Sequence, residues 1–199
     1  MQQLLTPYTR QIEKFAWWDE AFTEQELNWL QQKAKEAVEE AYIGRVNNEN
    51  KKSIFKDKNV RSTKLNWIFI EPNNAWVFDK LSHIVSSINA EHFGFELTGF
   101  GEPIQLSHYD ETQQSHYKWH VDFGSPGPSR KLSIVLQLSD PADYEGGQLQ
   151  LFTNSDVTNI PKKRGLITIF PSYTLHQVTP VIKGTRQTLV SWISGPPFK

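Results

Sequence analysis

The second half of the chain is dominated by short apolar runs with a period of two residues or none. The clearest is RKLSIVLQLSD (residues 130–140), and it is followed by GGQLQLF, GLITIF and RQTLVSWI. Between them lie stretches rich in turn-forming residues, such as GSPGP, SDPADYEGG, TNSDVTNIPKKRG and PVIKG. Short strands at regular spacing, separated by glycine, proline, asparagine and aspartate, predict a sandwich or barrel of antiparallel strands.

The first half of the chain carries helix signals. Thr23 and Glu26 have the spacing of a capping box, and Phe22 and Leu27 that of a hydrophobic staple. A second helix is predicted from about residue 74 to residue 90, with one apolar face formed by Val77, Leu81, Ile84, Val85 and Ile88. The apolar positions that define the first helix are Leu27, Leu30, Ala34, Ala37, Val38 and Ala41.

These two halves predict a single α+β domain over residues 1–199, because no clear linker divides them. Residues 1–96 would supply supporting helices, and residues 97–199 the strands. Residues 44–64 are polar and locally basic, which is typical of a solvated loop. As alternatives, residues 45–60 could form a mobile flap near a substrate, or the basic side chains could meet an acidic partner.

Composition excludes several kinds of site. The chain has no cysteine, which rules out disulfides, thiolate zinc sites, iron–sulfur clusters and a cysteine nucleophile. A formal net charge of −1 gives no general attraction to nucleic acid or to an anionic membrane. No apolar run reaches about 18 residues, and no signal peptide is evident, so a cytoplasmic location is expected.

The stretch HYKWHVDFG contains a candidate metal site. His120 and Asp122 are separated by one residue, so on a strand both side chains would point to the same face. Two imidazoles and one carboxylate leave three coordination positions open, which suits a non-haem Fe(II) enzyme that binds O₂. The sequence alone leaves several candidates for the third ligand: His83, His92, His108, His116 and His176.

Two zinc alternatives fit this stretch poorly. A structural zinc site would have a closed ligand shell, usually with thiolates, which this chain lacks. A zinc-protease helix needs a glutamate after the first histidine, and Tyr117 occupies that position.

Arg186 opens the predicted strand RQTLVSWI, ten residues after His176. Alternation places Thr188, Val190 and Trp192 on the same face as Arg186. A buried arginine needs an anionic partner, and guanidinium geometry favours a carboxylate. The partner could be a carboxylate of the protein or of a bound ligand.

Taken together, the H-x-D pair, a distal histidine, an arginine ten residues on and a tryptophan six beyond resemble the 2-oxoglutarate/Fe(II)-dependent dioxygenases. The prolyl 4-hydroxylase-like branch is the most similar. The resemblance runs through nearly the whole chain, including VRSTKLNWIF and RGLITIFPSYTLHQVTPVIKGTRQTLVSWISGPPF. It implies a double-stranded β-helix (jelly-roll, cupin-like) core and hydroxylation of a C–H bond with release of succinate and CO₂.

The resemblance also implies residue roles. His120, Asp122 and His176 would be the catalytic Fe(II) ligands, and Arg186 would bind the distal carboxylate of 2-oxoglutarate. O₂ would be consumed, with ascorbate as a supporting reductant. The remaining assignments are Tyr109, Thr188 and Trp192 toward the cosubstrate, and Tyr117 and Trp119 toward substrate.

Two departures and two alternatives accompany these assignments. Tyr109 lies eleven residues before His120, one more than in some relatives. Trp192 stands where the nucleic-acid demethylase branch carries a second arginine, which disfavours an alkylated-base substrate. The expected substrate is a prolyl residue in a peptide or protein. The alternatives are a hydroxylase of a free small molecule and a non-catalytic jelly-roll module that binds or senses a ligand.

Overall fold

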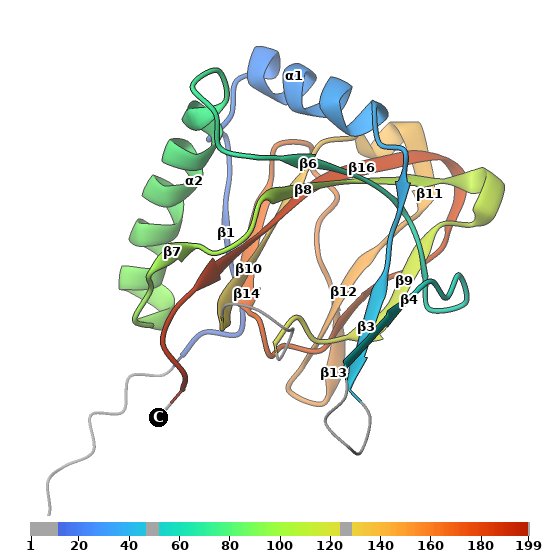
Figure 1. The fold of residues 1–199 in the computed structure, drawn as a ribbon. Coiled ribbons are helices and arrows are strands. Elements are labelled where there is room, and N and C mark those ends of the chain that lie inside the picture. The colour runs from blue at the N-terminus through green and yellow to red at the C-terminus, as the bar shows by residue number, and fades with distance from the viewer. Residues whose placement is uncertain (1–11, 47–51, 124–128, 199) are drawn as a thin grey trace, which may run out of the picture.

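The computed structural model describes residues 12–46, 52–123 and 129–198, with side chains omitted for residues 43–55. Two antiparallel sheets face each other, and two helices cover the outer side of the larger sheet (Figure 1). This is the layout of a jelly-roll core, and it agrees with the predicted sandwich or barrel. Within the described residues, no helix is both long and apolar enough to cross a membrane.

The larger sheet is organised around one long strand, β16 (Val181–Ser194), which pairs with four others. Two of its partners, β7 (Gly99–Phe100) and β11 (Tyr144–Gly146), lie off the main path of the sheet. Along that path the order is β1 (Ala16–Trp18), β14 (Ile167–Pro171), β10 (Arg130–Gln137), β16, β8 (Ile104–Asp110), β6 (Lys64–Ile68) and β2 (Glu39–Glu40).

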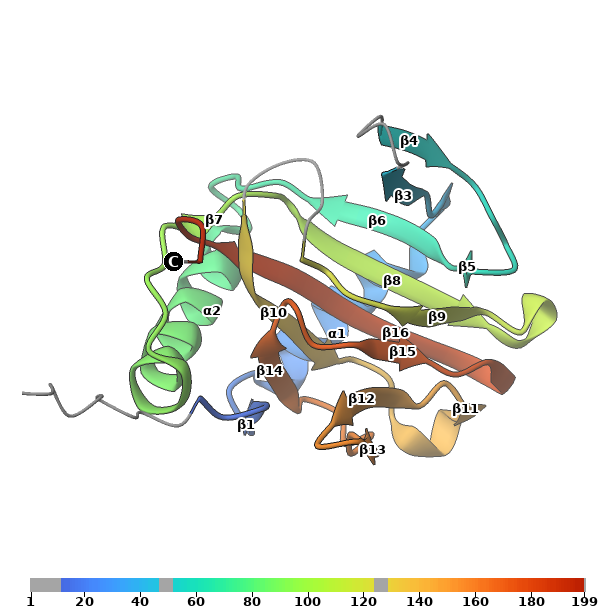
Figure 2. The ribbon, with the colours of Figure 1, turned by 90° about the horizontal axis from the view of Figure 1, so that it is seen from below.

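The smaller sheet carries three of the candidate metal ligands, His116, His120 and His176. Figure 2 shows β9 and β15 side by side, running in roughly the same direction as β16 of the larger sheet. The order of its strands is β13 (Asp156–Asn159), β12 (Leu149–Thr153), β15 (His176–Val178), β9 (His116–His120) and β5 (Arg61–Ser62). Four strands of the two sheets, β1, β2, β5 and β6, come from the first half of the chain, so residues 1–96 supply more than helices and a flap.

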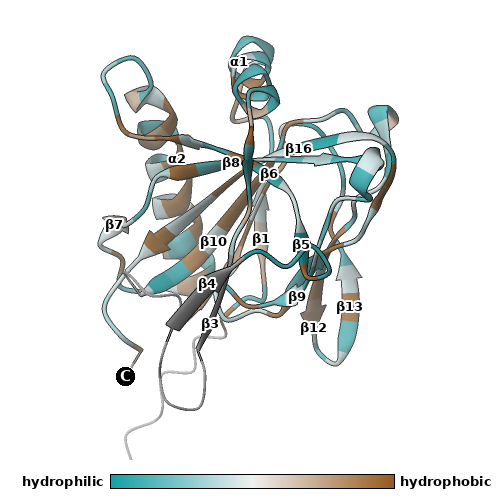
Figure 3. Ribbon diagram, turned by 45° about the vertical axis from the view of Figure 1, so that its right-hand side comes forward, coloured by the Kyte–Doolittle hydropathy of each residue, from teal (hydrophilic) through white to brown (hydrophobic). Residues whose placement is uncertain are grey.

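The helices pack on the larger sheet through their apolar faces. Helix α1 (Glu24–Lys35) begins with the predicted capping box, in which the Thr23 hydroxyl accepts from the Glu26 N–H at 3.3 Å. The Glu26 carboxylate accepts in return from the Thr23 N–H at 2.7 Å. Helix α2 (Ala75–Ile88) continues into a π-helical turn, Asn89–Phe93. In Figure 3, hydrophobic colour covers much of α2 and β10.

The predicted extension of the first helix to Ala41 is wrong, because α1 ends at Lys35. Instead, Glu39 and Glu40 form β2 and pair with Leu65 and Lys64 of β6, so their backbone groups bond to the sheet. Val38 is 82% exposed and joins no core. The apolar residues keep helical spacing as far as Ala41, but from Glu39 the backbone is hydrogen-bonded to β6 instead of forming a helix.

The prediction of an irregular loop at residues 44–64 is also wrong. The segment contains a hairpin of β3 (Ile43–Val46) and β4 (Lys52–Phe55), then β5 and the start of β6. The proposed flap at residues 45–60 includes residues 47–51, which lie outside the described part, so the flap stays a prediction.

From Lys131 to Gln137 every residue of β10 is buried, instead of alternately buried and exposed, because the strand is covered on both faces. One face, including Leu132, Ile134 and Leu136, packs into the core beneath the helices. The other face, with Ser133, Val135 and Gln137, looks into the space between the two sheets. A strand covered on both sides buries its polar residues too, and here those residues contact the site described below.

Gly146, the last residue of β11, lies at a shift in the register between β11 and β16, and its left-handed backbone can be tested. Gly146 has φ +74°, and a Cβ there would lie 2.1 Å from the Pro180 carbonyl oxygen. Gly165 has φ +81°, but a Cβ there would meet Leu27 at an ordinary 3.4 Å. Gly165→Ala should therefore cost only left-handed strain, about 1–2 kcal/mol. Gly146→Ala should cost about 1–3 kcal/mol more from steric overlap. Equal losses of unfolding free energy in urea denaturation would contradict this.

Candidate active site

A cavity of about 360 Å³ lies between the two sheets, and most of the predicted site residues line it. The larger sheet contributes Tyr109 from β8 and three residues of β16, namely Arg186, Thr188 and Trp192. The smaller sheet contributes Tyr117, His120 and His176. Asp122 lies two residues past the end of β9 at His120, so the predicted H-x-D pair spans a strand end rather than lying wholly on the strand.

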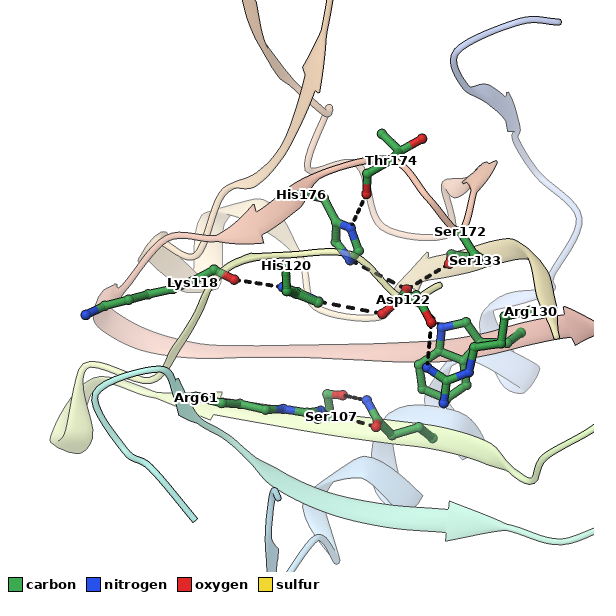
Figure 4. Close-up of polar contacts among 12 residues, drawn as sticks. Arg61, Ser107, Lys118, His120, Asp122, Arg130, Ser133, Ser172, Thr174 and His176 are labelled. Atoms are coloured by element: carbon green, nitrogen blue, oxygen red, sulfur yellow. Dashed lines mark hydrogen bonds and ion pairs between the residues drawn. The ribbon is translucent and has the colours of Figure 1, made fainter. Parts of the chain in front are cut away.

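His120, Asp122 and His176 form a compact cluster (Figure 4). One ligand atom from each residue lies within 4.8 Å of the other two. The His120 Nε2 is 3.7 Å from the Asp122 Oδ1, and the His176 Nε2 is 3.6 Å from Oδ2. The two histidines face each other because β15 pairs with β9 in a register that sets His176 opposite His120. The pairing of β15 with β9 therefore makes His176 the third residue of the cluster.

Both imidazoles are held in the same way by the backbone. The His120 Nδ1 lies 2.7 Å from the Lys118 carbonyl oxygen, and the His176 Nδ1 lies 2.9 Å from that of Thr174. A carbonyl can only accept, so each Nδ1 carries the proton and each Nε2 presents its lone pair toward the cluster. This is the tautomer that binds a metal through Nε2.

Asp122 is held as an anion. Burial would raise the pKa of its carboxyl, but His176, His120 and Arg130 outweigh that effect and lower the pKa below its usual value. Two donors also contact its Oδ2: the Ser133 hydroxyl at 2.7 Å and the Trp192 Nε1 at 2.9 Å.

His120 is held neutral. Burial, and then the neighbouring His176, lower the pKa of His120 well below its usual value. A neutral His pair with a carboxylate is the charge state in which two imidazoles and one carboxylate bind a divalent cation.

The lowered pKa of His120 predicts how the stability of the metal-free protein depends on pH. Protons bind the unfolded chain more tightly, so this stability is present above the ordinary imidazole pKa of about 6.5 and is lost as the pH falls below it. From about pH 7.5 to 5.5 the loss from this group should reach about 1.4 kcal/mol. Urea denaturation of wild type and His120→Gln at both pH values measures it. The same pH dependence in both proteins would contradict the assignment.

Arg186 is buried, with 2% exposure, and only part of its guanidinium is bonded. Nη2 donates to the Gln137 Oε1 at 3.2 Å, whereas Nε and Nη1 are buried without a partner among the described residues. The guanidinium carbon lies 5.2 Å from the centroid of the Tyr109 ring. The Thr188 hydroxyl is likewise buried and unpartnered. Within the described parts of the chain, no ion pair joins Arg186 to a protein carboxylate, so the alternative in which it bonds such a group is not supported there.

Other predicted residues lie elsewhere. Trp119 is on the outer face of the smaller sheet, against Phe152 at 6.3 Å between ring centroids, and does not line the cavity. Among the remaining third-ligand candidates, His116 bonds the backbone carbonyls of Gln114 and Asn59. Among the described residues, none of His83, His92, His108 and His116 lies close enough to His120 and Asp122 to share a metal ion with them.

The sequence reasoning missed several residues around the cavity. Arg130 pairs with Glu102 and lies over the Trp192 ring at 3.7 Å. Arg61 comes from the segment expected to be a solvated loop, yet it lines the cavity, 4.5 Å from the centroid of the Tyr117 ring. Nothing in the local sequence distinguishes these arginines from surface ones. Only the pairing of β5 with β9 brings Arg61 to the site.

Comparison with known families identifies this arrangement. Residues 104–194, which hold the cluster and Arg186, match the family model of the 2OG-Fe(II) oxygenase superfamily. The part of the chain that holds the site is thus similar to the 2OG-Fe(II) oxygenase superfamily. The fold of this chain is similar to that of a prolyl 4-hydroxylase from Pseudomonas putida, with a TM-score of 0.70, 18% identity and coverage of 92% and 94% of the two chains.

A prolyl hydroxylase from Trichoplax adhaerens is similar at a TM-score of 0.69 and 17% identity, covering 92% of this chain and 84% of that chain. Among curated proteins, a PKHD-type hydroxylase from Prochlorococcus marinus is 44% identical over 78 residues, which is 39% of this chain and 35% of the relative. One from Sphingopyxis alaskensis is 34% identical over 110 residues, 53% of this chain and 50% of the relative. The matches thus span a third to a half of these relatives.

Proposed function

We propose that this protein is an Fe(II)- and 2-oxoglutarate-dependent dioxygenase that hydroxylates a C–H bond, with a prolyl residue of a peptide or protein as the expected substrate. One observation carries the proposal. A His–Asp–His cluster and a buried arginine with unpartnered nitrogens line the same cavity. A metal site alone would not need the arginine, and a structural arginine would not need the metal site.

The residues fit iron. His120, Asp122 and His176 would hold the ion, since two neutral imidazoles and one carboxylate are the donor set that leaves positions open on non-haem Fe(II). When bound, iron together with 2-oxoglutarate activates O₂ and supplies the oxidising power for hydroxylation, with succinate and CO₂ as coproducts. Near neutral pH the chain itself keeps His120 neutral and Asp122 ionised, so neither of these two ligands has to lose a proton.

The residues also fit 2-oxoglutarate. The unpartnered Nε and Nη1 of Arg186 are donors that a carboxylate would satisfy. The Thr188 hydroxyl would add a further donor to the same group. Apolar side chains line other parts of the cavity wall and would pack on the methylene carbons of the cosubstrate; they are Val135, Leu149, Val178 and Val190.

The rim of the cavity supports a peptide substrate. It mixes a cation, Arg61, with aromatic Trp67 and Tyr42 and with the acidic Glu39 and Glu40. Such a mixed polar and aromatic rim can bond backbone amides and pack on a side chain at once. The Trichoplax adhaerens enzyme of similar fold was solved with a peptide fragment of the hypoxia-inducible factor oxygen degradation domain.

The experiment has two parts. First, Fe(II)-loaded protein is titrated anaerobically with 2-oxoglutarate, and a weak visible charge-transfer band is expected. Second, the aerobic protein is incubated with a library of proline-containing peptides. Succinate formation should rise with a peptide that gains the mass of one oxygen atom. A band without any modified peptide would keep the reaction class and shift the search to free small molecules. No band and no succinate would overturn the proposal and favour a binding module.

A further inference from the structure

The carboxylate of Asp122 is clamped from one side only. Ser133 Oγ and Trp192 Nε1 both donate to Oδ2, at 2.7 and 2.9 Å. Both oxygens face the cluster, Oδ1 at 3.7 Å from the His120 Nε2 and Oδ2 at 3.6 Å from the His176 Nε2. Among the described residues, however, no side-chain hydrogen bond falls on Oδ1. A carboxylate offers about four lone-pair sites over its two oxygens, so two donors fill those of Oδ2.

Each donor is itself held in place. The Ser133 and Ser172 hydroxyl oxygens lie 3.0 Å apart. Because the single Ser133 hydrogen points to Asp122, Ser172 is the donor of that pair. On the other side, Arg130 lies 3.7 Å above the Trp192 ring and is anchored by Glu102. The Ser133 and Trp192 side chains are buried, so water does not compete for these bonds.

We infer that Ser133 and Trp192 are positioning residues that occupy Oδ2 and so restrict Asp122 to binding the metal through Oδ1 alone. This rests on the proposed function. Its consequence follows from counting coordination positions. The three protein ligands leave three positions open, and 2-oxoglutarate and O₂ together need all three. A carboxylate that bound through both oxygens would take one of them.

The test reads the binding mode of the carboxylate directly. Protein with ¹³C-labelled aspartate is loaded with Mn(II), and the infrared difference between loaded and metal-free protein is recorded. The gap between the asymmetric and symmetric carboxylate stretches is wide when one oxygen binds and narrow when both bind. Metal occupancy is followed separately by the electron paramagnetic resonance of free Mn(II).

The variants remove the donors with little change of shape. Ser133→Ala deletes one hydroxyl, and Trp192→Phe deletes the N–H but keeps a ring beneath Arg130. Ser191→Ala is the matched control, because Ser191 precedes Trp192 on β16 and its buried hydroxyl has no partner among the described residues. Each single variant keeps one donor, so it stays measurable even where the double variant binds Mn(II) weakly.

The wild type and Ser191→Ala should show the wide gap. The double variant should show a narrow gap, and each single variant a smaller narrowing. The inference would be overturned if the separation of the two carboxylate stretches were unchanged in all three metal-loaded donor variants, or if it were already narrow in the wild type. Either result would leave the proposed function standing. Failure of the wild type to bind Mn(II) would instead overturn the proposed function, and this inference with it.

Discussion

Replacing Arg186 with methionine should raise the dissociation constant for 2-oxoglutarate by about 100-fold or more while leaving Fe(II) binding intact. Hydrogen bonds to charged groups contribute about 1.5–3 kcal/mol each, and two guanidinium nitrogens are free to make them. Arg186→Lys should recover only part of the affinity, because an ammonium keeps the charge but not the two-pronged geometry. The anaerobic charge-transfer titration measures both variants.

The same substitution should not destabilise the ligand-free protein, and this separates a binding role from a structural one. A buried guanidinium with two unpartnered nitrogens is unfavourable until an anion arrives. Without 2-oxoglutarate, Arg186→Met should therefore unfold at the same or higher urea concentration than the wild type. With Mn(II) present in both proteins, the further addition of 2-oxoglutarate should stabilise only the wild type. A large loss of stability in the ligand-free variant, with cosubstrate affinity unchanged, would show that Arg186 is structural.

The strands of the second half of the chain could be predicted because the patterns that indicate them are local in sequence. The period of two in residues 130–138 and the turn residues around it depend on neighbours in sequence. The end of α1 was not readable, because it depends on β6, whose pairing with Glu39 and Glu40 is a tertiary event. For the same reason the sequence predicts a loop where β3 and β4 pair, since each strand has only four residues.

In the candidate site, too, the local relations could be predicted from the sequence, whereas those that depend on tertiary structure could not. Spacing alone put His120 beside Asp122, and alternation put Arg186, Thr188 and Trp192 on one face; all five line the cavity. The choice of His176 came from family resemblance, and in the structure it follows from the register between β15 and β9. The bond from Trp192 to Asp122 joins residues 70 positions apart, and no local pattern predicts it.

Replacing His176 with alanine should lower Fe(II) affinity by about 100-fold or more and reduce 2-oxoglutarate consumption to background. Loss of a residue that merely orients a metal ligand already costs about 10–100-fold, and His176 is placed to be a ligand itself. Removing His176 would also leave the buried Asp122 carboxylate without the imidazole Nε2 that faces its Oδ2 at 3.6 Å. Anaerobic Fe(II) titration and succinate formation measure the two effects.

His116→Ala is the matched control for this result. His116 lies on the same strand as His120, is partly exposed, and bonds backbone carbonyls rather than the cluster. Its loss should leave metal affinity within a few-fold of the wild type. If His176→Ala and His116→Ala bound Fe(II) equally well, the ion would be held elsewhere. The cavity would then be a binding site for an anion recognised by Arg186, with the facing histidines only packing across β9 and β15.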